Sequence, residues 1–211
     1  MANTQELEKY FTHVYKSFYW HMGSGESRSG MGSTLAYTGS ISQILEMIHE
    51  KLDIQTFLDT SCGDWNWMKH IRKNLKSKYI GLDIVKDIVD VNNTNYGDNQ
   101  TTFVHSDMLS YFKNMEDKSI DLCLCRHTLE HLPTQYIKDC LLEFKRVCKY
   151  VLVTSAKDGE NSEVSYPWGY RKVNLNQTPY IEIIGEPMNI FLDGPSDCKT
   201  ESAPMHFYKF N

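Results

Sequence analysis

Apolar and polar positions follow two different periods along the chain, and each period predicts its own kind of element. Near the N-terminus apolar residues recur every three or four positions, which predicts an amphipathic helix over roughly residues 4–19. A second helical pattern follows it, with Thr38 or Ser40 as the expected N-cap. The clearest helix of the second half is expected over residues 133–148.

Short apolar runs with the composition of β-strands lie between the helical segments. Strands that alternate with helices indicate a mostly parallel sheet covered on both sides, which is a doubly wound α/β fold. After residue 156 a polar stretch leads into late runs that favour antiparallel strands. The early runs are residues 55–59, 78–84, 101–107, 119–127 and 150–156, and the late runs are residues 181–185, 188–192 and 205–210.

Composition narrows the class of protein. A chain of 211 residues with 41% apolar residues can bury one sizeable core, so we expect a single domain over residues 1–211. The net charge of −5 and the lack of a basic stripe argue against nucleic acid as a partner. We find no signal region and no apolar run long enough to span a membrane, so we expect a soluble, cytoplasmic protein without membrane contact.

The sequence FLDTSCGDWNWM, residues 57–68, contains the first chemical signal. Asp59 ends a strand, and Asp83 ends the next one, where a carboxylate suits the two hydroxyls of a ribose. A dinucleotide would need glycines where Trp65 and Trp67 stand, and Asp59 and Asp64 would repel its phosphates. A cationic nucleoside fits this turn better, and S-adenosylmethionine is such a molecule.

The motifs FLDTSCGD, YIGLDI, FVHSDML and SIDLCLCRHTLEHL together resemble the four cofactor motifs of class I S-adenosylmethionine-dependent methyltransferases over roughly residues 55–155. The segment ESRSGMGST at residues 26–34 and the segment NLNQTPY at residues 174–180 are similar to small members of that class. The resemblance implies a Rossmann-like seven-stranded sheet, with S-adenosylmethionine as cofactor and S-adenosylhomocysteine as product. It divides the chain into N-terminal helices with a lid loop (1–50), a cofactor-binding core (51–156) and an acceptor side (157–211).

Carried over to this sequence, the resemblance implies roles for residues at four strand ends. Asp59 and Gly63 would contact the methionine end of the cofactor, and Asp83 the ribose. Asp59 and Asp83 could instead cap the helices that follow them, and the tryptophans could serve packing alone. The residues expected to bind the cofactor are Arg28, Asp59, Ser61, Gly63, Trp67, Asp83, Ile84, Asp107, Met108 and Arg126.

The segment HTLEH, residues 127–131, matches a zinc-hydrolase pattern, His-x-x-Glu-His. That pattern needs both histidines on one helix, whereas His127 directly follows a strand-like run, so we expect no metal. In a methyltransferase the segment would face the acceptor. Histidine is a suitable base near neutral pH, so His127 or His131 is the expected catalytic base, with Arg126 beside them. Either histidine could also be a packing residue, and Glu130 is expected to be a solvated acid at a helix start.

Further candidates come from the flanking segments. Arg28 could clamp a carboxylate of the cofactor or the acceptor, and Arg171 and Asn174 could contact the acceptor from the other side. Each could equally be a solvated surface residue. Aromatic residues that could form a wall for a sugar or a planar ring are Tyr15, Tyr19, Trp20, Tyr166, Trp168 and Tyr170.

These observations favour an S-adenosylmethionine-dependent methyltransferase that acts on a small molecule, by O-methylation of a sugar or metabolite hydroxyl. Alternatives are N-methylation of a small molecule or peptide, a nucleotide-dependent dehydrogenase, a zinc hydrolase that uses HTLEH, and a cofactor-binding protein without catalysis. The sequence leaves the acceptor atom and the oligomeric state open.

Overall fold

The computed structural model describes residues 4–23, 25–163, 169–194 and 204–211. Its centre is a seven-stranded sheet in the order β3-β2-β1-β4-β5-β7-β6. β1 to β5 pair in parallel, whereas β7 is antiparallel to both β5 and β6. The strands are β1 (Thr56–Thr60), β2 (Lys78–Asp83), β3 (Thr101–His105), β4 (Ile120–Cys125), β5 (Cys148–Thr154), β6 (Asn189–Leu192) and β7 (Pro204–Lys209).

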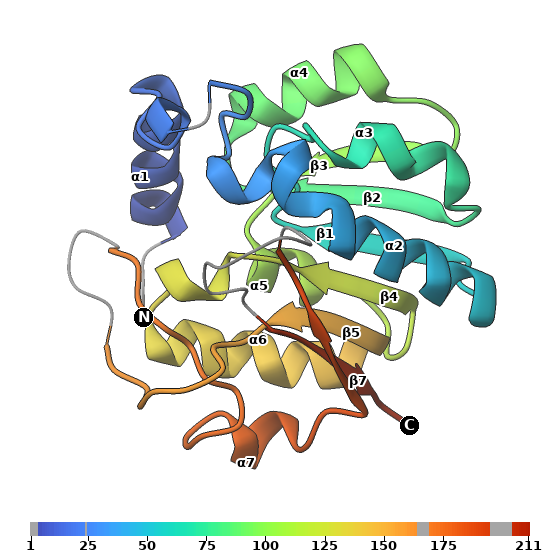
Figure 1. Cartoon of the computed structure of the whole chain (residues 1–211), viewed down its shortest axis with the longest axis vertical. Coiled ribbons are helices and arrows are strands. Elements are labelled where there is room, and N and C mark those ends of the chain that lie inside the picture. Colours follow the sequence, from blue (N-terminus) through green and yellow to red (C-terminus); the bar gives the residue numbers. More distant parts are fainter. Residues whose placement is uncertain (1–3, 24, 164–168, 195–203) are drawn as a thin grey trace.

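Helices cover both faces of this sheet (Figure 1). One face packs against α2, α3 and α4, and the other against α5, α6 and α7, with α1 beside the carboxyl ends of the strands. The helices are α1 (Thr4–Lys16), α2 (Leu35–Lys51), α3 (Met68–Ile71), α4 (Lys86–Tyr96), α5 (Met108–Phe112), α6 (Thr134–Val147) and α7 (Ile181–Ile184). Four 3₁₀ turns are η1 (His21–Gly23), η2 (Met31–Ser33), η3 (Arg72–Asn74) and η4 (Leu129–His131).

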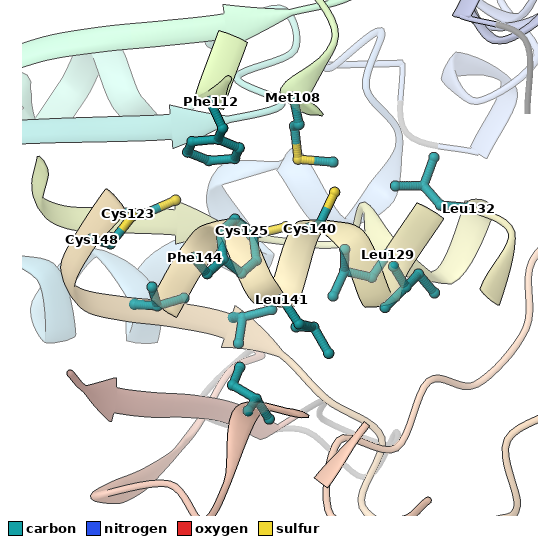
Figure 2. Packing of buried hydrophobic residues seen from close by; sticks show 14 of the residues in the cluster. Met108, Phe112, Cys123, Cys125, Leu129, Leu132, Cys140, Leu141, Phe144 and Cys148 are labelled. Carbon is teal, nitrogen blue, oxygen red and sulfur yellow. The ribbon is translucent and has the colours of Figure 1, made fainter. Parts of the chain in front are cut away.

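The core under α6 is rich in sulfur. Figure 2 shows Cys123, Cys125, Cys140 and Cys148 among Leu, Phe and Met side chains, and all four are fully buried. Cys123 and Cys125, both on β4, therefore belong to the core. Burial raises the pKa values of these two thiols well above the ordinary value, so they act as small apolar residues.

The strand and helix pattern of the sequence is largely confirmed, and the differences have local causes. α1 ends at Lys16 because the chain turns through Phe18, which has a φ of 55°. α2 begins at Leu35, before both expected N-caps, because the Glu26 carboxylate accepts the Leu35 N–H at 2.9 Å. Capping by Thr38 or Ser40 was therefore wrong.

The late run at residues 181–185 is a helix, α7, and not a strand. Backbone bonds from the N–H groups of Tyr180 and Ile181 to the Gln177 carbonyl start a helical turn there. Tyr180 and Ile184, four residues apart, both pack into the core beside α6. The two other late runs form β6 and β7, and their antiparallel pairing is confirmed. No helix among the described residues is long and apolar enough to cross a membrane.

Candidate functional site

A cavity lies at the edge of the sheet where β1, β2 and β4 end. The strand order reverses between β1 and β4, and doubly wound sheets bind ligands at such a point. α1, the segment before α2 and the start of α5 complete the wall. Of the expected cofactor-binding and catalytic residues, those that line the cavity are Asp59, Ser61, Gly63, Trp67, Asp83, Ile84, Asp107, Met108, Arg126, His127 and His131.

The turn after β1 requires glycine at one position. Gly63 has a φ of +58°, and a Cβ placed there would lie 2.3 Å from Ser29 Oγ. Its N–H donates to Asp83 Oδ2 at 3.0 Å, which fixes the turn against the end of β2. Of the two tryptophans in this turn, Trp65 packs against aromatic rings of the core, whereas Trp67 lines the cavity.

Two carboxyl groups are enclosed at the ends of β1 and β2. Burial raises the pKa of Asp59 to about 7, although a hydrogen bond of 2.7 Å from the Tyr79 hydroxyl lowers it. Burial likewise raises the pKa of Asp83 to about 6, against the opposing effect of N–H groups from Val85 and Gly63. Neither carboxylate caps the helix that follows its strand. A buried carboxyl that is this costly to ionise is typical of a ligand site.

The capping interpretation does apply to the third acid of the cavity. Asp107 is the N-cap of α5, and its Oδ1 accepts the Ser110 N–H at 3.1 Å. The same oxygen accepts the Tyr136 hydroxyl at 3.0 Å. Met108 and Ile84 add apolar surface on this side of the cavity, which suits the flat face of an adenine.

Arg126, at the end of β4, joins three separate parts of the chain. Its Nε donates to Asp193 Oδ2 at 2.7 Å, and its Nη1 donates to the Gly32 carbonyl at 2.7 Å. Its guanidinium also lies 5.8 Å from the centre of the Trp67 ring. The side chains of Arg126 and Asp193 are both buried, at 6% and 1% exposure, so this ion pair is shielded from solvent.

His127 lines the cavity and has a carboxylate partner. It has a φ of 51°, and its N–H donates to Thr154 Oγ1 at 3.0 Å. Its Nδ1 lies 3.1 Å from Glu130 Oε1, and its Nε2 lies 3.7 Å from Asp193 Oδ2. Glu130 is buried, so the expectation of a solvated acid was wrong. Burial acts to raise the pKa of Glu130, but the hydrogen bond and the charge of His127 hold this pKa below its usual value.

His131 has a different environment. Its ring lies 5.4 Å from Trp20, 6.3 Å from Phe11 and 6.0 Å from Tyr170, measured between ring centres. Burial lowers the pKa of His131, which favours the neutral imidazole. Part of the expected aromatic wall is therefore built around His131. Of its other members, Tyr15 lines the cavity, Tyr19 is exposed, and Tyr166 and Trp168 lie outside the described residues.

Three expected site residues do not line the cavity. Arg28 donates from Nη2 to the Tyr15 carbonyl at 3.2 Å, and its guanidinium faces the Phe18 ring. Arg171 is buried behind the 130–132 segment, where Nη2 donates to the Leu132 carbonyl at 2.7 Å. Asn174 is buried too and donates to the Gly159 carbonyl. Contact of these three residues with cofactor or acceptor stays a prediction.

Several residues of the site were missed by the sequence reasoning. Asp193 follows β6, far along the chain from Arg126, and its only signal is an acid at the end of an apolar run. Ser29 and Ser33 line the cavity from a Gly/Ser-rich segment that resembles a linker. Tyr136 enters from the first turn of α6, where it looks like a core residue. Ser29, Ser33 and Asp193 are far from the strand-end motifs in sequence, and Tyr136 lies four residues after the last of these motifs.

The zinc-hydrolase pattern does not have the required geometry. Only residues 129–131 form a 3₁₀ turn, and His127 precedes it, so the two histidines are not one turn apart on an α-helix. Glu130 contacts His127 directly instead of facing a shared metal. Within the described parts of the chain, no group of three or more His, Cys, Asp or Glu residues is arranged to hold a metal ion.

Comparison with known proteins concerns the fold and the class of the chain. Residues 58–150 match the family model described as "Methyltransferase domain". The chain has the Rossmann-like fold of class I S-adenosylmethionine-dependent methyltransferases, and the matched segment is similar to their methyltransferase domain. The motif ESRSG and residues 174–180 lie outside the matched region. No curated protein sequence matches the chain significantly.

Solved structures with the same fold cover nearly the whole chain. The 1,6-didemethyltoxoflavin-N1-methyltransferase of Burkholderia thailandensis, solved with S-adenosylhomocysteine, has a TM-score of 0.68 at 13% identity, over 100% of this chain and 92% of its own. The magnesium protoporphyrin IX methyltransferase of Synechocystis, solved with S-adenosylmethionine, has a TM-score of 0.62 at 13% identity. The match covers 100% of this chain and 98% of that protein. The [4+2]-cyclase SpnF has a TM-score of 0.63 at 13% identity, and the match covers 90% of this chain and 76% of that protein. At such identities the likeness concerns the fold alone.

The cofactor of this class is S-adenosylmethionine, and S-adenosylhomocysteine is the product. The residues of the cavity fit this cofactor. Glycine is sterically required at position 63 of the turn after β1, and the pKa values of the buried carboxyls of Asp59 and Asp83 are raised. Asp83 can hold the ribose hydroxyls, and Asp59 and Gly63 can hold the amino-acid end. When bound, the cofactor supplies a methyl group to a nucleophile.

Proposed function

We propose that the protein methylates a hydroxyl oxygen of a small uncharged acceptor, such as a sugar, with His127 as general base. The observation that carries this proposal is the contact of 3.1 Å between His127 Nδ1 and Glu130 Oε1 at the wall of the cavity. The proposal also takes Asp59, Gly63, Asp83 and the other cavity residues named above as the cofactor site.

The contact with Glu130 assigns the two ring nitrogens different tasks. A carboxylate only accepts hydrogen bonds, so Nδ1 of His127 carries the hydrogen and Nε2 is the basic nitrogen. Nε2 then takes the proton of the acceptor hydroxyl, and the Glu130 charge stabilises the imidazolium that forms. His131 is the weaker candidate, because its ring is surrounded by Trp20, Phe11 and Tyr170 and its pKa is lowered by burial.

The charges around the cavity favour an uncharged acceptor. Arg126 is the one Arg or Lys side chain among the lining residues of the described chain, and Asp193 already neutralises it. Asp59, Asp83 and Asp107 line the same cavity, so a phosphate or carboxylate on the acceptor would meet repulsion without a free cation. An uncharged acceptor avoids this repulsion, which supports a sugar or another neutral metabolite.

The test is methyl transfer to a panel of acceptors that differ only in charge. Neutral sugars, the matched uronic acids and sugar phosphates, and the matched amino sugars are incubated with S-adenosylmethionine. Release of S-adenosylhomocysteine and the product mass are then measured. We expect product from neutral hydroxyl compounds. Methylation on nitrogen, or preference for the acids, would contradict the proposal.

Two variants test the base. His127→Ala is expected to lower turnover by about 10²-fold or more while the affinity for S-adenosylhomocysteine stays within twofold. His131→Phe keeps a ring among its aromatic neighbours and should retain most of the turnover. Full activity of His127→Ala would show that no base acts there. If His131→Phe loses activity and His127→Ala keeps it, His131 and not His127 is the base.

A further inference from the structure

Residues 25–35, called the strap below, are bound tightly to the turn that follows β1. Asp64 holds the strap: its Oδ2 accepts the Arg28 N–H at 2.6 Å, and its two carboxylate oxygens accept the Ser27 hydroxyl at 3.0 Å. Ser29 Oγ donates to Asp64 Oδ1 at 3.0 Å and accepts the Asp64 N–H at 2.9 Å. Bonds to a charged carboxylate are the stronger kind of hydrogen bond, so one side chain fixes three consecutive residues.

A second set of contacts holds both ends of the strap. Asn66 Nδ2 donates to Glu26 Oε1 at 2.6 Å and to the Ser33 carbonyl at 3.0 Å. Arg126 donates to the Gly32 carbonyl at 2.7 Å, which joins the strap to the end of β4. The Gly/Ser-rich composition is typical of a flexible linker, yet this segment is held from both ends.

The strap also faces the cavity. Ser29 and Ser33 both line it, and Ser29 Oγ lies close to the space that a side chain at position 63 would fill. The Ser29 hydroxyl is already used by Asp64 and by Tyr15, whose hydroxyl lies 2.8 Å away. The Ser33 hydroxyl makes no hydrogen bond with any residue in the described ranges, so it is free to bind a ligand.

We infer that the strap is a fixed wall of the cofactor site, that Asp64 is the residue that positions it, and that Ser33 contacts the bound cofactor. The inference rests on the cofactor site of the proposed function. It goes beyond the family match, which begins at residue 58 and leaves the strap out. The turn after β1 and the strap then form one composite binding element, in which Ser29 covers Gly63 and Ser33 supplies a hydroxyl that the turn itself lacks.

The experiment combines two readouts on the whole protein. Hydrogen exchange of the strap amides is measured without ligand, and the affinity for S-adenosylhomocysteine is measured by calorimetry. Asp64→Asn should speed exchange over residues 25–35 by about tenfold or more and weaken affinity by about tenfold. Ser33→Ala should weaken affinity by a few-fold without any change in exchange. Asp98→Asn, whose carboxylate accepts the Gln100 N–H in a distant turn, is the matched control and should change neither.

The outcomes separate this inference from the proposed function. Faster exchange in Asp64→Asn with an unchanged affinity would overturn the strap as a cofactor wall. Weaker affinity with unchanged exchange would overturn the positioning role of Asp64. If Asp64→Asn fails to fold, Ser29→Ala removes the two bonds between Ser29 Oγ and Asp64 and is read by the same criteria. A wild-type protein that ignores S-adenosylhomocysteine would overturn the cofactor site itself, whereas binding without any methylated acceptor leaves this inference intact.

Discussion

Asp59 is a side chain whose charge costs stability, and replacing it by asparagine measures that cost. The carboxyl is 5% exposed and accepts one hydrogen bond of 2.7 Å, from the Tyr79 hydroxyl. Burial raises its pKa to about 7, and the charge of nearby Asp83 adds to this effect. Asn has the same shape and keeps an oxygen for Tyr79, but it carries no charge. The variant Asp59→Asn therefore removes the titration and little else.

The sign and size of the effect follow from proton linkage. The folded protein binds the Asp59 proton more tightly than the unfolded chain, so the unfolding free energy falls as the pH rises from about 4 to about 7. The shift from 3.8 to about 7 corresponds to about 4 kcal/mol in total at about 1.4 kcal/mol per unit. Between pH 5 and pH 8, the wild-type protein should lose about 2–3 kcal/mol that Asp59→Asn retains.

Urea unfolding of the ligand-free protein at pH 5 and pH 8, followed by tryptophan fluorescence, measures this difference. Asp83 titrates in both proteins, so most of its contribution cancels when the two pH values are compared. Asp90→Asn, an exposed acid on α4, is the control and should show no such gain. A stability difference that is equal at both pH values, within about 0.5 kcal/mol, would refute a desolvated carboxyl. The stabilised variant should also bind S-adenosylhomocysteine more weakly.

Three further substitutions test other parts of the site. Gly63→Ala should lower the unfolding free energy by about 1–3 kcal/mol, because its Cβ would lie 2.3 Å from Ser29 Oγ at a φ of +58°; an unchanged thermal midpoint would contradict this. Asp193→Asn leaves the buried Arg126 guanidinium without its carboxylate, so we expect the unfolding free energy measured in urea to fall by about 3 kcal/mol. A decrease of less than about 1 kcal/mol would show that the ion pair contributes little to stability. Glu130→Gln should reduce kcat about tenfold at unchanged KM for the cofactor, and steady-state kinetics with equal kcat would remove Glu130 from the mechanism.

The central sheet could be predicted from the sequence because its parallel strands are buried on both faces. Such strands appear as short apolar runs, and the acids at their ends converge because parallel carboxyl ends share one edge of the sheet. That geometry brings Asp59 and Asp83 into one cavity with the end of β4. Sequence spacing was therefore informative for Asp59, Asp83 and Arg126, which the ends of strands position.

The remaining features depend on contacts between distant segments. The start of α2 is fixed by Glu26, and the charge of Arg126 is balanced by Asp193. Burial of Glu130 depends on how the 129–131 turn packs, and the expectation of a solvated acid came from local sequence alone. No periodicity or motif encodes such pairs, because each partner is an ordinary polar residue in its own segment.

Asp59 at the end of β1 and Asp64 in the turn after it have different roles, and this changes the reason to expect that the site disfavours phosphates. From the sequence, both Asp59 and Asp64 are expected to repel a polyanion. In the structure, Asp64 is absent from the lining of the cavity, and its charge is directed at the N–H and hydroxyl groups of the strap. The expected selection against phosphates therefore depends on Asp59 and Asp83, two enclosed carboxyls whose pKa values are raised to about 7 and about 6. A cationic ligand favours their charged forms, so binding of S-adenosylmethionine should strengthen as the pH rises through about 6 to 7, and calorimetry across that range would show it.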